Sequence, residues 1–255
     1  MSSETPSSDP LVAVPVPVAW AERSERQAAA FDSIGERYDE AFPHKEGQEE
    51  RIRRLLDLLP PNAHVLDLGS GTGLPTARQL VQAGARVTGY EISERMIELA
   101  RVNVPEAEFV QADILDLEPV EAQYDAVVAF FSLLCLPRAR IPEALGRVRA
   151  SLLPGGLLCL SMVETDLDDT PISFLGSEVR VSGYPRAELR TVLEEAGLIV
   201  EDERVVTYDH RMQQPVPAPL DAIGGPEDPS YELLNSRLFA RGARGFTYRT
   251  TRRRR

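Results

Sequence analysis

A glycine-rich loop between an apolar run and a helical pattern constrains this chain more than any other feature. Residues 63–68 contain the run Ala-His-Val-Leu-Asp-Leu, and Gly69, Gly71 and Gly73 follow at intervals of two. A short apolar run that ends at glycine is typical of a buried strand, and apolar residues recur at helical spacing over residues 74–83. This order of strand, tight turn and helix indicates the first unit of a parallel α/β sheet, with a ligand site at the turn.

The same alternation continues along the chain. We expect further strands near residues 86–90, 108–111, 124–130, 157–163 and 198–208, with a late candidate at 236–243. Helical patterns lie between them, near residues 93–100, 140–152 and 185–196. This order predicts an α/β fold, a doubly wound and mostly parallel seven-stranded sheet flanked by helices. In such folds the ligand lies at the carboxyl ends of the strands.

Composition divides the chain into four regions. We expect a disordered tail at 1–18, an N-terminal helical lid at 19–60, the core domain at 61–243 and a solvated arginine-rich tail at 244–255. Helical spacing of Phe31, Ile34, Tyr38 and Phe42 predicts one helix over residues 20–42, and a second follows over 46–59.

Charge and cysteine content exclude several classes of protein. The net charge of -12 argues against a partner with a phosphate backbone, so we expect no nucleic-acid partner. Cys135 and Cys159 lie in apolar runs, which favours buried thiols over disulfides. No apolar stretch reaches the roughly 20 residues of a membrane span, and the first residues are unlike a secretory signal. We therefore expect no membrane partner and a cytoplasmic protein.

The loop fits a positively charged nucleoside better than a dinucleotide. Glu91 ends the second expected strand, at the spacing of about 20 residues expected for an acceptor of ribose hydroxyl bonds. A dinucleotide fingerprint would need glycine at position 74, where the chain has Leu74. Asp67, just before the loop, would repel a pyrophosphate but would favour the sulfonium and ammonium groups of S-adenosylmethionine (SAM). An NAD-dependent reductase is the weaker alternative.

Five stretches in order resemble the successive motifs of class I SAM-dependent methyltransferases. These are Asp67-x-Gly69-x-Gly71-x-Gly73, Gly89-Tyr90-Glu91-Ile92-Ser93, Gln111-Ala112-Asp113-Ile114, Ala129-Phe130-Phe131-Ser132-Leu133-Leu134 and Leu153-Pro154-Gly155-Gly156. The likeness covers roughly residues 30 to 200 and is greatest to small-molecule enzymes of actinobacterial type. It specifies the cofactor and leaves the acceptor open.

The resemblance implies a role for each residue of the cofactor site. Gly69, Gly71 and Gly73, with Ser70 between them, would let the backbone approach the methionine and ribose parts of SAM. Asp67 would face the positive end of the donor, and Glu91 would bind the ribose hydroxyls.

The adenine side of the site follows from the same resemblance. Asp113 would accept a hydrogen bond from the adenine amino group, and Phe130 would line the pocket near the methyl group. Ile92, Met96 and Ile114 would wall the adenine ring. Two alternatives stay open: these three apolar residues are also ordinary core residues by type, and Asp113 is also suited to capping a turn before Ile114.

Methyl transfer from a sulfonium is an in-line displacement, so holding the acceptor in a dry site supplies much of the acceleration. We expect Tyr38 to face the cofactor or the acceptor, and we take His44 and Glu164 as candidate bases, with His210 a further one. No set of His, Cys and carboxylate residues has zinc-like spacing, so no metal is predicted.

These observations predict a SAM-dependent methyltransferase that acts on a small molecule, of the kind found in specialised metabolism. A non-catalytic SAM-binding regulatory protein and a nucleic-acid or protein methyltransferase are the alternatives. The sequence leaves open whether oxygen, nitrogen or carbon is methylated, and whether the protein is a monomer or a homodimer.

Overall fold

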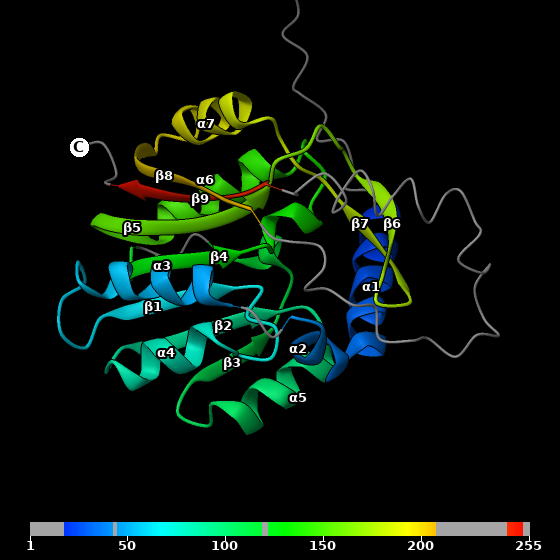
Figure 1. Ribbon diagram of the computed structural model, residues 1–255, viewed down its shortest axis with the longest axis horizontal. Coiled ribbons are helices and arrows are strands. Elements are labelled where there is room, and N and C mark those ends of the chain that lie inside the picture. The colour runs from blue at the N-terminus through cyan, green and yellow to red at the C-terminus, as the bar shows by residue number, and fades with distance from the viewer. Residues whose placement is uncertain (1–17, 43–44, 119–121, 208–243, 252–255) are drawn as a thin grey trace, which may run out of the picture.

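The structure is a computed structural model, and it describes residues 18–42, 45–118, 122–207 and 244–251 (Figure 1). The N-terminal tail up to residue 17, His44, His210 and the candidate strand at 236–243 lie outside the described residues.

A central sheet organises the chain. Its strands are β1 (His64–Leu68), β2 (Arg86–Glu91), β3 (Glu108–Gln111), β4 (Tyr124–Phe130), β5 (Leu152–Val163), β8 (Ile199–Thr207) and β9 (Arg244–Thr251). The seven strands lie in the order β3-β2-β1-β4-β5-β9-β8. The first five pair in parallel, and β9 pairs antiparallel with both β5 and β8. A Rossmann-like α/β fold with a parallel sheet is thus confirmed.

Helices cover both faces of this sheet. Val65 of β1 packs in a cluster with residues of α3 (Glu46–Leu56), α4 (Thr76–Gln82) and α5 (Glu94–Asn103). Leu66 and Leu68 point the other way and join a cluster with α6 (Ile141–Ser151) and α7 (Arg186–Glu195). The alternation follows from the period of two in a strand. Each fully buried aliphatic side chain stabilises the fold by about 1.5–3 kcal/mol.

Sheet order places the ligand site. The chain passes from β1 to β2 on one side, whereas β4 lies on the other side of β1. The order of strands therefore reverses between β1 and β4, and a crevice forms outside their carboxyl ends at such a switch point. The glycine loop begins directly after Leu68, at the end of β1.

The N-terminal helix differs from the prediction in one respect. The single helix expected over residues 20–42 is two helices, α1 (Val18–Ile34) and α2 (Arg37–Ala41). Gly35 between them has φ +48°, a left-handed conformation that ends a helix. Ile34, just before the break, is only 1% exposed, so the turn anchors the end of α1 and redirects the chain into α2.

A small hairpin packs against α1, as Figure 1 shows at one end of the sheet. Its strands are β6 (Thr170–Phe174) and β7 (Ser177–Val181), which are not among the strands expected from the sequence. Leu175 and Gly176 form the two-residue turn with φ +51° and +81°. Two positive φ angles give the strong local twist that two-residue hairpins require.

The end of the chain is a second correction. Residues 244–255 were expected to form a solvated tail, but residues 244–251 form β9 inside the sheet. Phe246, Thr247 and Tyr248 are aromatic and β-branched residues that favour strands, and the arginines concealed this pattern. Because β9 lies between β5 and β8, its backbone groups pair on both sides.

None of the described helices is long and apolar enough to cross a membrane.

Candidate functional site

A cavity of about 670 Å³ opens at the carboxyl ends of β1, β2 and β4. One side is formed by the glycine loop, the end of β2 and the turn that follows β3. The opposite side is formed by α1, α2, the β6–β7 hairpin and the segment after β4. Its volume lies in the range of roughly 300–1,000 Å³ that is usual for small-molecule sites.

The glycine loop has two positions where a side chain would change the site in different ways. Gly69 and Gly71 have φ +72° and +53°. A Cβ on Gly69 would lie 2.4 Å from Cβ of Ser132, so the loop packs against the end of β4 only with glycine there. A Cβ on Gly71 would have no neighbour within 4 Å, so this backbone faces open space. The loop is held by the protein at Gly69 and is accessible to a ligand at Gly71.

Glu91 is buried and holds the loop in place. One carboxylate oxygen accepts hydrogen bonds from the backbone N–H groups of Ile92 and Ser93, and the other accepts from Gly71, all at 2.9 Å. Burial raises the pKa of Glu91, and these three N–H groups oppose the shift. A carboxylate offers about four acceptor positions, so Glu91 retains capacity for a hydroxyl group of a ligand in the cavity.

Asp67 is buried in the cavity wall without a partner for one oxygen. It is 2% exposed, and its Oδ2 atom has no hydrogen-bond partner. Burial, and then the nearby Glu91, raise the pKa of Asp67 from 3.8 to about 8. A positively charged ligand group beside it would favour the ionised form and supply the missing partner.

Three hydroxyl groups in the cavity wall are also buried without a hydrogen-bond partner. The side-chain oxygens of Ser70, Thr72 and Ser132 are buried, line the cavity and have no partner. Unsatisfied buried polar groups are uncommon in proteins, and a cluster of them in one cavity points to a polar ligand. Hydroxyl donors beside Asp67 suit an amino-acid moiety, because Asp67 can accept from its ammonium group and hydroxyls can donate to its carboxylate. The residues present therefore fit the methionine end of SAM.

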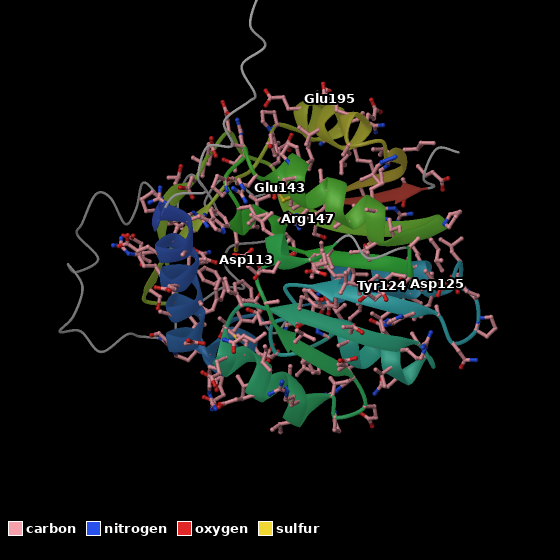
Figure 2. All side chains as sticks on the ribbon, turned by 180° about the vertical axis from the view of Figure 1, so that it is seen from behind. Asp113, Tyr124, Asp125, Glu143, Arg147 and Glu195 are labelled. Carbon is pink, nitrogen blue, oxygen red and sulfur yellow. The ribbon has the colours of Figure 1, made fainter. Side chains whose placement is uncertain are left out.

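Asp113 performs the capping role that the sequence left open. It precedes the 3₁₀ turn η1 (Ile114–Asp116), and its Oδ1 accepts from Leu115 N at 2.9 Å. Its other oxygen accepts a hydrogen bond from the Ser24 hydroxyl of α1. Figure 2 shows Asp113 on the side of the sheet toward α1, away from Tyr124 and Asp125 at the far end. Its contact with adenine stays a prediction, although it lines the cavity.

The apolar residues assigned to the cofactor all line the cavity. Ile92 and Ile114 are half-buried, whereas Met96 and Phe130 are buried. Met96 is 1% exposed, so it contributes mainly to the packing of α5 behind the cavity wall. The ring of Phe130 ends β4 at the point where the two sides of the cavity meet.

The three candidate catalytic residues have different positions. Tyr38 lines the cavity, and its ring lies 5.2 Å from that of Phe42 and 6.4 Å from that of Phe174. His44 lies outside the described residues. Glu164 follows β5 but does not line the cavity, and its carboxylate lies 4.0 Å from the guanidinium of Arg186. Of the two that the structure describes, Tyr38 lies at the cavity and Glu164 does not.

Several lining residues were not predicted. On α1, Arg23, Ser24 and Gln27 face the cavity, and Gln27 exchanges two hydrogen bonds with the backbone of Arg180 on β7. The spacing of four between Arg23 and Gln27 marks one helix face, but nothing in the sequence identifies the hairpin as its partner. Ser132 follows Phe131, whose φ of +55° is rare for an aromatic residue. Strained backbone of this kind concentrates at functional sites.

Among the described residues, no group of three or more His, Cys, Asp or Glu side chains could hold a metal ion.

Comparison with known proteins extends these observations. A family described as a methyltransferase domain matches residues 65–156. The trans-aconitate 2-methyltransferase of Enterobacter sp. (strain 638) is 34% identical over 181 residues, which are 64% of this chain and 69% of that protein. The enzyme of the same name from Paracidovorax citrulli (strain AAC00-1) is 40% identical over 124 residues, 45% of this chain and 46% of that protein. This chain thus spans about half the length of some of its curated relatives.

Solved structures share the fold. Burkholderia thailandensis 1,6-didemethyltoxoflavin-N1-methyltransferase, with bound 1,6-didemethyltoxoflavin and S-adenosylhomocysteine, superposes with a TM-score of 0.63. The match covers 98% of this chain and 94% of that one at 20% identity. Identity at this level establishes likeness of fold only.

Proposed function

Because this chain belongs to the class I SAM-dependent methyltransferases, we propose that it transfers a methyl group from SAM to a small-molecule acceptor. The observation that carries the proposal is one continuous cavity. It extends from the unpartnered oxygens around Asp67 to an apolar space beneath α1 and the hairpin. A donor and an acceptor can therefore meet inside one enclosure.

In this proposal the glycine loop and its neighbours hold the cofactor. Asp67 and the hydroxyls of Ser70 and Thr72 bind its amino-acid end, Glu91 accepts from the ribose, and Asp113 lies beside the adenine. Bound SAM supplies a methyl group already activated on a positively charged sulfur. The protein itself then orients the two reactants and excludes water from them.

The N-terminal helices act as a lid in this proposal. Support comes from α1, which contacts both sides of the cavity. Asp32 of α1 accepts from the Ser93 hydroxyl and from Arg95 N at the start of α5, at 2.6 and 3.1 Å. Arg23 of α1 donates to Asp169 and to the Cys135 carbonyl on the other side. A helix fixed in this way covers the cavity and favours in-line displacement in a closed site.

The acceptor side favours a small molecule over a macromolecule. The cavity is bounded by side chains from α1, α2 and the hairpin, and the net charge of -12 disfavours a nucleic acid. A role in specialised metabolism of actinobacterial type rests on the sequence resemblance. Tyr38 lines the cavity, Glu164 does not, and His44 and His210 lie outside the described residues, so we assign no general base.

The first test is calorimetric binding of S-adenosylhomocysteine, followed by release of that product from SAM in the presence of a metabolite panel. We expect Glu91→Gln to weaken binding at least about tenfold, because a charged acceptor contributes roughly 1.5–3 kcal/mol. Glu98→Gln on the exposed face of α5 removes the same charge outside the cavity and is the control. Binding without turnover of any acceptor would favour a non-catalytic regulator. Absence of binding would contradict the proposal.

A further inference from the structure

The wall of the cavity that α1, α2 and the hairpin form has a distinct character. We name the acceptor chamber by six of its lining residues, which come from α1, α2, the residue that follows α2, β6 and β7: Phe31, Tyr38, Phe42, Ile172, Phe174 and Val179. Phe174 is its centre, since its ring lies 6.5 Å from Phe31, 6.4 Å from Tyr38 and 5.7 Å from Phe42. These surfaces suit an apolar body of aromatic size.

The positive charges on the cavity wall are already neutralised. Of the described residues that line it, only Arg23 and Lys45 are cationic. Arg23 is 12% exposed at its side chain, and its Nε and Nη2 atoms donate to Oδ1 of Asp169 at 2.8 and 2.6 Å. Lys45 is ion-paired with Asp39 and also donates to the Leu74 carbonyl at 3.2 Å.

Carboxylate residues outnumber cationic residues among the described residues that line the whole cavity. They are Glu46, Asp67, Glu91 and Asp113, of which Asp67 is mostly protonated at pH 7 because burial raises its pKa to about 8. An acceptor with a carboxylate would lose its water and gain no unpaired cation from these walls. Burial of a charge without a partner is strongly unfavourable.

Resting on the methyl transfer proposed above, we propose that the acceptor is an uncharged molecule with an apolar body of aromatic size, and that Asp169 enforces this choice by neutralising Arg23. The relatives named for trans-aconitate act, by that name, on a tricarboxylate. The chamber of this chain is unsuited to such a ligand.

Asp169 is well placed for this positioning role. Its backbone N–H donates to Ser182 Oγ at 2.8 Å, and its second carboxylate oxygen lies 3.0 Å from Arg180 Nε. Its φ of +44° is a left-handed conformation that asparagine also tolerates. Asp169→Asn should therefore keep the loop folded and leave Arg23 as an unneutralised cation in the wall.

The test compares two probes that share a ring system and differ in charge. 2-Naphthol and 2-naphthoate are titrated at pH 7 into the full chain, with and without saturating S-adenosylhomocysteine, and trans-aconitate is titrated alongside. We expect 2-naphthol to bind and 2-naphthoate to bind at least about tenfold more weakly. Naphthoate or trans-aconitate binding as tight as naphthol, or no naphthol binding, would each overturn the inference.

Asp169→Asn then tests the assigned residue. We expect it to raise the ratio of naphthoate to naphthol affinity by at least about fivefold, because an unpaired Arg23 can bind the carboxylate. Asp166→Asn is the matched control: it removes a carboxylate from the same loop that pairs with Arg138, outside the cavity wall. An unchanged ratio in Asp169→Asn, or an equal rise in the control, would refute the role of Asp169. Failure to bind S-adenosylhomocysteine would refute only the proposed function, since the probe ratios are also measured without it.

Discussion

The two sides of the cavity are built in different ways. The cofactor side comes from residues 67–114, a nearly continuous stretch in which each strand end supplies the next part of the site. The acceptor side joins α1 and α2 to a hairpin more than a hundred residues later, through contacts such as Arg23 with Asp169. The first side is therefore specified locally, whereas the second exists only once distant segments pack together.

The largest expected effect is that of a substitution at Gly69 in the glycine loop. A matched substitution at another glycine distinguishes the cost of a steric clash from the cost of a left-handed backbone. Gly69→Ala should destabilise the fold by about 3 kcal/mol or more and abolish S-adenosylhomocysteine binding, because its Cβ would meet Ser132 at 2.4 Å. Gly84→Ala is the control: φ is +87° there, but a Cβ would have no neighbour within 4 Å. It should cost about 1 kcal/mol, from the left-handed backbone alone. Thermal unfolding and calorimetry measure both, and equal losses would show that the contact with Ser132 is unimportant.

A second prediction tests whether the two sides are independent. Phe174→Ala removes the ring that contacts Phe31, Tyr38 and Phe42, so we expect the Kd of 2-naphthol to rise at least about tenfold. The Kd of S-adenosylhomocysteine should change less than about twofold, because none of the three rings that Phe174 contacts is among the residues assigned to hold the cofactor. Val102→Ala, at a site 80% exposed on α5, controls for the loss of an apolar side chain. A tenfold loss of S-adenosylhomocysteine affinity would show that the two sides form one unit.

The third prediction concerns pH and the cofactor side. The pKa of Asp67 is about 8 in the folded protein, compared with an ordinary value of 3.8. Between these two pH values the folded chain therefore binds more protons than the unfolded chain. The free energy of unfolding of the unliganded protein should therefore fall as pH rises from about 4 to about 8. Asp67→Asn should reduce this dependence and leave the part due to Glu91, whose pKa burial also raises, which urea titrations at several pH values would reveal.

Ligand binding should show the opposite pH dependence. An ammonium group beside Asp67 favours the ionised carboxylate, so S-adenosylhomocysteine should bind more tightly as pH rises from 6 to 8, by up to about tenfold per unit. 5′-Methylthioadenosine lacks the amino-acid moiety and should bind independently of pH. If both ligands respond equally, Asp67 does not face the amino-acid end.

The smallest expected effect lies where the two sides meet. Ser24→Ala removes the hydrogen bond from α1 to Asp113, which contributes about 1 kcal/mol. We expect S-adenosylhomocysteine to dissociate a few times faster in stopped-flow measurements, because α1 covers the cavity less firmly. Ser33→Ala, at an exposed position of the same helix, is the control. Equal rates in both variants would exclude a part for α1 in retaining the ligand.

The features that the sequence predicts, and those it does not, divide between locally specified segments and segments that depend on distant packing. The positions of β1 to β5 and β8, the glycine loop and the place of Glu91 at the end of β2 follow from local patterns, since residue period and turn chemistry act within one stretch. The break at Gly35, the hairpin turn at Leu175 and the pairing of Gln27 with Arg180 depend on distant packing. The hairpin did have a local signal, because Ile172 and Phe174 alternate with polar residues, as do Val179 and Val181.

The candidate site divides in the same way. All the predicted cofactor residues except Gly73 line the cavity, and Gly73 serves the packing of the loop, where a Cβ would lie 3.1 Å from Val104. Of the candidate bases, Glu164 lies at a strand end but outside the cavity, because the position of a strand end does not determine where a side chain points.

The place of β9 bears on how the chain folds during synthesis. The last described strand lies inside the sheet, between β5 and β8, so the ribosome must release residues 244–251 before the sheet can close. Until then β5 has one unpaired edge, and unpaired edges promote association between chains. Removing residues 244–251 would therefore separate β8 from the sheet and expose the edge of β5.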